Sequence, residues 1–120
     1  MQLEWWGQLF LLKGVCLYMK IIQLLSDRIE EELNDAEFYI KEALYAKEDF
    51  PNLSATFYKL STEEMGHANM LHDQVVSIIS EYRKSHGDPP DKMQAIYDYL
   101  HQKHIDKANE IKIEQALYKG

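Results

Sequence analysis

The residues of this chain best suited to chemistry are two glutamates and a histidine set into apolar stretches. In LSTEEMGHANMLHDQ, residues 60–74, Glu64 and His67 lie three positions apart, about one turn of a helix. Glu32 has a similar setting in the earlier run DRIEEELNDAEFYIKEALYAKE. A carboxylate or an imidazole on an apolar face is costly to bury unless it is paired or binds a metal ion. Carboxylate and imidazole ligands together suit iron and manganese, and the single cysteine excludes a thiolate cluster.

Helical periodicity places both glutamates in the middle of an apolar stripe. At about 100° per residue, the neighbours within about 40° of Glu32 are Leu25, Ala36, Tyr39, Ala43 and Ala46. Those within about 40° of Glu64 are Leu53, Phe57, Leu60, Ala68, Leu71, Val75, Ile78 and Tyr82. His67 lies about 60° from Glu64 on the same stripe. The sequence therefore predicts that Glu32, Glu64 and His67 turn inward to bind a metal ion.

One chain carries only half of a dinuclear carboxylate site. Such a site takes a Glu from each of two helices and a Glu-x-x-His pair from each of two others. A second copy, related by a two-fold axis, would supply the other half in equivalent roles. The alternative is that the inward Glu and His side chains pair only with each other and bind no metal.

The elements that must position these residues are three helices. We predict them at about residues 20–48, 52–86 and 90–118, separated by DFPN at 49–52 and by GDPP at 87–90. Pro51 suits the first turn of the second helix, and Asp88 is a candidate N-cap for the third. The predicted fold is all-α: an antiparallel helical hairpin plus a third helix, which would complete a four-helix bundle by dimerisation. Residues 1–19 are predicted to be either an apolar arm that packs on a partner subunit or an extension upstream of a start at Met19.

Composition narrows the classes of partner. Of 120 residues, 46% are hydrophobic and 28% charged, and the net charge of −7 disfavours nucleic acid and anionic membranes as partners. Glu4, Lys13 and Lys20 interrupt the apolar N-terminal stretch, so membrane insertion is not expected. Cys16, as the single cysteine, excludes an internal disulfide and favours a reducing, cytoplasmic location.

The two motifs together resemble the ferritin-like superfamily, specifically its rubrerythrin and encapsulated-ferritin branch. EELNDAEFY matches a Glu placed seven residues before a Tyr, and STEEMGHANMLH matches the E-x-x-H-x-x-M/L-L helix. The resemblance covers residues 26–82 and implies that Glu32, Glu64 and His67 are iron ligands. It also implies that Tyr39 lies beside the ligands, close to the redox chemistry. The chain lacks the CxxC pair of rubredoxin-type centres, and its tail IEQALYKG does not match an encapsulin-docking peptide.

The third helix carries two further histidines. Its apolar stripe is centred on His104 and contains Met93, Tyr97, Leu100, Ala108 and Ile111, with His101 about 60° to one side. His104 and His101 are therefore candidates for additional metal ligands. The alternative is an interfacial histidine that is satisfied without metal, on a helix that covers the seam between two copies or drives higher assembly.

These observations and the resemblance predict a homodimer or higher homo-oligomer with two iron ions, or manganese in their place, at the dimer interface. The expected activity is ferroxidase: iron(II) is oxidised by dioxygen or peroxide for storage or detoxification. Two alternatives stay open, a rubrerythrin-like peroxide scavenger with the same ligands and a non-catalytic helical assembly protein.

Overall fold

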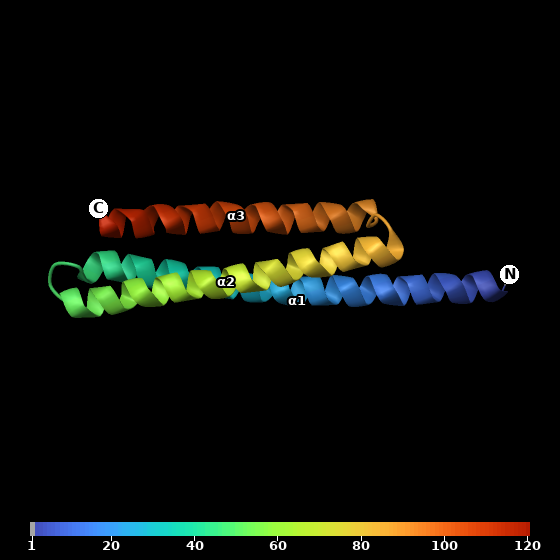
Figure 1. Cartoon of the computed structure of the whole chain (residues 1–120), viewed down its shortest axis with the longest axis horizontal. Helices are drawn as coiled ribbons and strands as arrows, with labels where there is room; N and C mark the ends of the chain where they lie inside the picture. Colours follow the sequence, from blue (N-terminus) through green and yellow to red (C-terminus); the bar gives the residue numbers. More distant parts are fainter. Residues whose placement is uncertain (1) are drawn as a thin grey trace.

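The computed structural model describes the backbone of residues 2–120 and the side chains of residues 16–120. Three helices follow in order: α1 (Gln2–Ala46), α2 (Pro51–His86) and α3 (Asp91–Lys119). They lie side by side in a rod whose Cα atoms extend 73 × 18 × 18 Å (Figure 1). The predicted all-α fold class is confirmed, with no strand among residues 2–120. No helix in the described part of the chain is both long enough and apolar enough to cross a membrane.

The helix boundaries follow from proline and glycine. Pro51 occupies the first turn of α2, as predicted, where its missing N–H costs nothing. α2 ends at His86 and is followed by Gly87 in the C-cap position, whose φ of 78° is accessible to glycine; the Gly87 N–H donates to the Arg83 carbonyl. The prediction of Asp88 as N-cap of the third helix is wrong, because α3 begins at Asp91 with Pro90 in the N-cap position. A residue that precedes a proline is pushed out of the helical region, so Pro89 cannot start the helix.

The first helix is longer than predicted. α1 begins at Gln2 rather than near residue 20, so residues 2–19 continue the same helix. No proline precedes Pro51, and the chain therefore carries no strong stop signal in this region. The predicted packing of this arm on a partner subunit concerns side chains of residues 1–15, which lie outside the described residues.

The hairpin of α1 and α2 is held by a heptad-like core. From Ile22 to Ala43 the buried residues of α1 recur at alternating intervals of four and three, and Ala46 at the end of the helix is also buried: Ile22, Ser26, Ile29, Leu33, Ala36, Ile40, Ala43 and Ala46. Those of α2 follow the same register: Ser54, Ser61, Met65, Ala68, Val75, Ile79 and Tyr82. This repeat is typical of helices that pack side by side with a small crossing angle. The small residues allow a close approach, at which the Ser61 hydroxyl donates to the Ala36 carbonyl at 2.7 Å.

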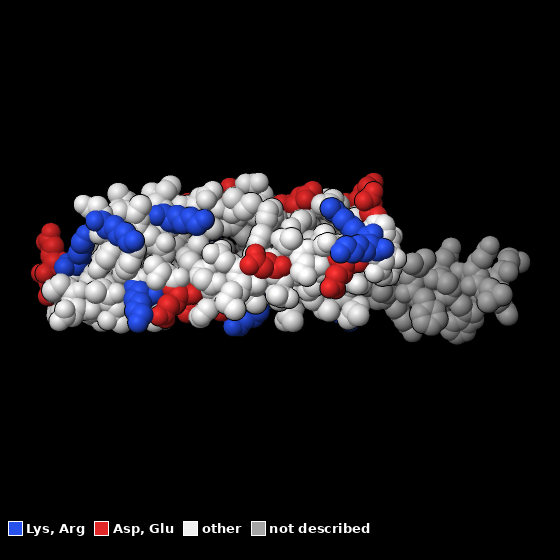
Figure 2. Space-filling view, in the orientation of Figure 1, with Lys and Arg blue, Asp and Glu red and all other residues white. Residues whose placement is uncertain are grey.

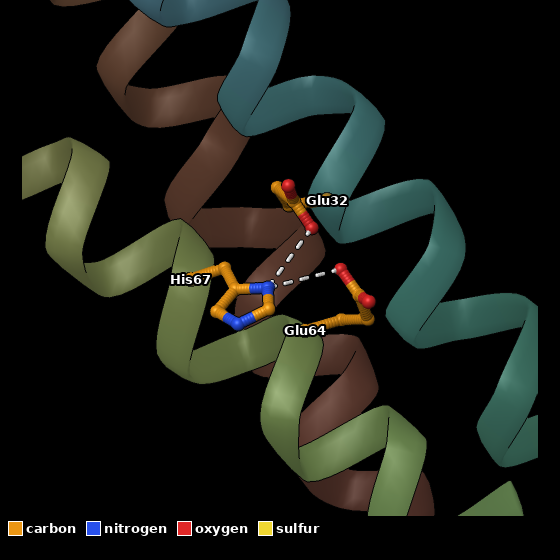
Figure 3. A group of neighbouring side chains, drawn as sticks. All are labelled: Glu32, Glu64 and His67. Carbon is orange, nitrogen blue, oxygen red and sulfur yellow. Dashed lines mark ion pairs between the residues drawn. The ribbon is translucent and has the colours of Figure 1, made fainter.

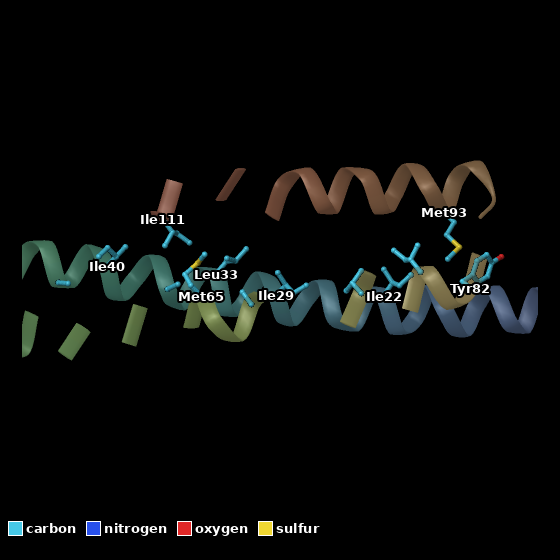
Figure 4. Close-up of a cluster of buried hydrophobic side chains, with 13 residues drawn as sticks. Ile22, Ile29, Leu33, Ile40, Met65, Tyr82, Met93 and Ile111 are labelled. Atoms are coloured by element: carbon cyan, nitrogen blue, oxygen red, sulfur yellow. The ribbon is translucent and has the colours of Figure 1, made fainter. Parts of the chain in front are cut away.

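The third helix packs along one side of this hairpin, mainly against α1 (Figures 1 and 4). Met93 and Ile111 of α3 are buried in the core, 6% and 0% exposed. Lys103 lies 2.9 Å from Glu30 of α1 at the edge of this contact, and its hydrogen bond lowers the pKa of the Glu30 carboxyl. Lysine, arginine and acidic side chains alternate on the face drawn in Figure 2, without an extended patch of one sign there. α3 therefore covers one side of the hairpin of its own chain and leaves the opposite side uncovered.

The uncovered side is apolar, and we call it the open face. Its members on α1 and α2 are Leu17, Leu24, Leu25, Tyr39, Leu53, Phe57, Leu60, Leu71 and Ile78. Leu17, Leu24 and Leu53 are 57%, 61% and 47% exposed, and the other members are half-buried. The predicted stripes therefore contain the heptad core and, beside it on the side away from α3, apolar residues that stay partly exposed; of these, Leu25, Phe57, Leu71 and Ile78 also pack against the core.

Candidate metal centre

The structure brings Glu32, Glu64 and His67 together where α1 crosses α2 (Figure 3). Glu64 and His67 project from successive turns of α2, and Glu32 reaches them from the antiparallel α1. The Nδ1 atom of His67 lies 3.6 Å from Oε2 of Glu32 and 3.5 Å from Oε2 of Glu64. Each residue offers one ligand atom, and these atoms all lie within 4.8 Å of one another. Among the described residues, no other group of three acidic, histidine or cysteine side chains meets this condition.

The three side chains differ in exposure, with the two glutamates largely buried and the histidine facing solvent. The Glu32 and Glu64 side chains are 16% and 19% exposed, whereas His67 is 55% exposed. The prediction that both glutamates lie mid-stripe is wrong for the single chain, because the core passes through Leu33 and Met65, one residue later. The site therefore lies at the edge of the core, on the open face, and α3 passes behind it (Figure 3).

Among residues 16–120, Arg28 is the one lysine or arginine whose side chain pairs with this group, and the sequence analysis did not single it out. Its Nη2 atom lies 3.9 Å from Oε1 of Glu32, one turn along α1. The Arg28 side chain is 55% exposed, and an ion pair in such a setting contributes little to stability. The i,i+4 spacing of Arg28 and Glu32 could have indicated this contact. A divalent cation would compete with Arg28 for the Glu32 carboxylate.

The donor set of two carboxylates and one imidazole fits iron(II) or manganese(II) chemically. Three protein ligands leave further positions for water, substrate or the ligands of a second chain. Because His67 is exposed and the glutamates lie at the surface of the hairpin, a second protomer could approach these ligands directly. The geometry can thus serve a metal ion held by one chain or a larger centre between two.

Tyr39 lies on the open face but not against the ligands. It follows Glu32 by two helical turns, about 10 Å along the axis. Its ring stacks on Phe57 of α2, with ring centroids 6.1 Å apart, and makes an edge contact with Phe38. This position makes Tyr39 part of the apolar surface around the site, and its suggested redox role stays a prediction.

His101 and His104 do not join the Glu32, Glu64 and His67 group. Both project from α3, on the other side of the hairpin, where His101 contacts His72 of α2. His72 lies outside the stripe centred on Glu64, yet it continues the heptad register of Met65 and Ile79. A 3.5-residue period would have revealed this position, whereas a stripe centred on Glu64 did not.

Comparison with known proteins adds no relative: no family model, curated protein or solved structure matches this chain. The function of this chain is therefore inferred from the site itself and from the two motifs that the sequence carries.

Proposed function

We propose that this protein is a short ferritin-like protein that binds two iron ions between two copies of the chain and acts as a ferroxidase. The observation that carries the proposal is the convergence of Glu32, Glu64 and His67 from two helices onto the open face. These are the residues that the Glu-x6-Tyr and Glu-x-x-His motifs single out. Manganese(II) is accommodated by the same ligand types.

The open face supports the shared centre. Pairing two hairpins through this face would place four helices around a common core, with α3 of each chain on the outside. The apolar residues that flank the ligands, Leu25 and Tyr39 on α1 and Leu60 and Leu71 on α2, would be removed from water by such a contact. A two-fold axis near the ligands would bring together two Glu32, two Glu64 and two His67, the full ligand set of a dinuclear carboxylate site.

The chain would contribute ligand geometry and a shielded environment, and the iron would carry the redox chemistry. Two iron(II) ions give up one electron each, and dioxygen accepts both electrons with two protons to form hydrogen peroxide. Arg28 would be displaced from Glu32 on binding, because the carboxylate exchanges a weak surface contact for a cation. The exposed His67 edge would let iron(II) reach the site before the dimer closes.

Metal stoichiometry tests this assignment. Protein purified without chelators and reloaded with iron(II) should hold about one ion per chain, and Glu64→Ala or His67→Ala should abolish this binding while helix content stays intact. Glu63→Ala is the matched control, because Glu63 is an exposed neighbour on α2 whose only ion-pair contact is with Lys59 at 4.0 Å. Unchanged iron content in both ligand variants would rule out the assignment.

Catalysis is tested separately from binding. The natural chain and the Glu63→Ala variant should oxidise added iron(II) stoichiometrically in air, whereas the His67→Ala variant should not. If the protein instead turned over peroxide continuously with an added reductase and oxidised little iron, the ferroxidase assignment would be wrong. The assignment of Glu32, Glu64 and His67 as metal ligands would not be affected.

A further inference from the structure

Three of the five histidines of the chain gather at a second place, on the side of the hairpin that α3 covers. His72 of α2 and His101 and His104 of α3 line a cavity of about 350 Å³. Its walls include the apolar residues Ile29, Leu33, Ala68, Ile105 and Ala108 and the amides Asn69 and Asn109. No acidic residue lines this cavity, and Lys112 is the one lysine or arginine among its lining residues. Its donors are therefore nitrogen-rich, in contrast to the carboxylates of the Glu32 site.

His72 and His101 already hold two ring nitrogens at the spacing of metal ligands. Nε2 of His72 lies 3.1 Å from Nδ1 of His101, and the rings are inclined by 20°. With zinc–nitrogen bonds of the usual length, two ligands of a tetrahedral ion are separated by about 3.3 Å. Tyr97 stacks on His101 with centroids 5.5 Å apart, which helps fix the orientation of the ring. A cation could therefore replace the proton that the two imidazoles share without a movement of α2 against α3.

His104 adds a buried nitrogen that lacks a partner. The residue is only 8% exposed, and its Nε2 makes no hydrogen bond to any of the described residues. Leaving a buried polar atom unsatisfied typically costs about 1–3 kcal/mol. His104 follows His101 by one turn of α3 and lines the same cavity, but the ligand atoms of the three histidines do not all lie within 4.8 Å of one another, so ligation by His104 requires its side chain to change rotamer.

We propose that His72 and His101, with His104 as a third ligand, bind a divalent cation of the zinc type between α2 and α3. Imidazole ligands suit zinc, copper, nickel and iron, whereas the additional carboxylates of the site on the open face suit manganese as well as iron. The bound ion would tie α3 to the hairpin, and this role does not depend on the function proposed for the Glu32 site.

The test uses the full chain with the first site removed by the triple substitution E32Q/E64Q/H67Q. Isothermal titration with zinc(II), and cobalt(II) absorption as a spectroscopic probe, should give one tightly bound ion per chain in this background. His72→Gln or His101→Gln added to it should weaken zinc binding by more than the roughly 10–100-fold that loss of a supporting partner causes. His86→Gln is the matched control, because His86 is exposed at the end of α2, and it should leave zinc affinity unchanged.

A second measurement guards against variants that fold poorly. In the triple-substituted protein with His72, His101 and His104 intact, zinc should shift the ring nitrogen resonances of these three residues and leave His86 unaffected. Absence of zinc binding in this protein, or zinc affinity that survives both His72→Gln and His101→Gln, would overturn the proposal. The pair would then be a neutral histidine hydrogen bond that joins the two helices. Iron binding by the unsubstituted chain is measured separately, so a negative result for the histidine site would leave the assignment of the Glu32 site unaffected, and the reverse.

Discussion

Assembly and metal binding are predicted to be coupled through Glu32. Each chain supplies only three ligands, so a dinuclear centre requires two chains, and without metal the interface would crowd four carboxylates around one axis. Replacing Glu32 with Gln keeps the shape of the side chain and removes two of these four charges per dimer. The side chain is 16% exposed and lies 3.6 Å from His67, so the substitution should delete a ligand without opening a large space.

The expected magnitude follows from mass action. An ion that binds only the assembled state stabilises it by about 2.7 kcal/mol when its concentration is 100 times its Kd. Two ions per dimer therefore contribute about 5.4 kcal/mol, which lowers the dimer dissociation constant by about ten-thousand-fold. Glu32→Gln should change both the strength of the metal-free dimer and its response to added metal. Its metal-free dimer should be tighter than that of the natural chain, because like charges have been removed, and added metal should no longer strengthen it.

Sedimentation velocity over a range of protein concentrations, with and without iron(II) under anaerobic conditions, measures these constants. Glu31→Gln is the control, because it makes the same charge change at a neighbouring exposed position whose carboxylate pairs with Arg28. The control should retain the metal dependence. A metal-loaded chain that sediments as a strict monomer, or a Glu32→Gln protein whose dimerisation still responds to metal, would refute the shared centre.

Three further outcomes are expected from the structure. A chain beginning at Met19 should stay helical by circular dichroism and should bind iron, because every core position from Ile22 onward is retained; loss of either property would make the upstream turns part of the fold. Ile111→Ala should lower the free energy of unfolding by about 2–5 kcal/mol in urea, because this fully buried side chain anchors α3, and a cost below about 1 kcal/mol would contradict that role. Burial lowers the folded-state pKa of His72 and His104. The free energy of unfolding should therefore be highest above about pH 6.5, the ordinary pKa of histidine, and should fall as the pH drops below it. The slope should reach at most about 2.7 kcal/mol per pH unit, because two protons are taken up. Urea midpoints between pH 7.5 and 5 check this slope, and a flat profile would show that these histidines protonate equally well in both states.

Local chemistry made the helices and the ligand group predictable from the sequence. Pro51 and Gly87 mark helix ends because one lacks an N–H and the other reaches positive φ, and such effects act within a few residues. The i,i+3 spacing of Glu64 and His67 fixes their relation on any helix. The motifs also predict that Glu32, 32 positions before Glu64 in the chain, approaches this pair, and the distances to His67 agree.

The side of each helix that faces each neighbour was decided only by tertiary packing. Periodicity records that a residue is apolar, but it does not distinguish a surface buried within the chain from one left for a second copy. The stripe around Glu32 and Glu64 was therefore treated as one surface, whereas the structure divides it into a heptad core and the open face. The placement of α3 likewise decided that His101 meets His72 rather than Glu64. Such a choice depends on the combined packing of all three helices, which no single stretch of sequence contains.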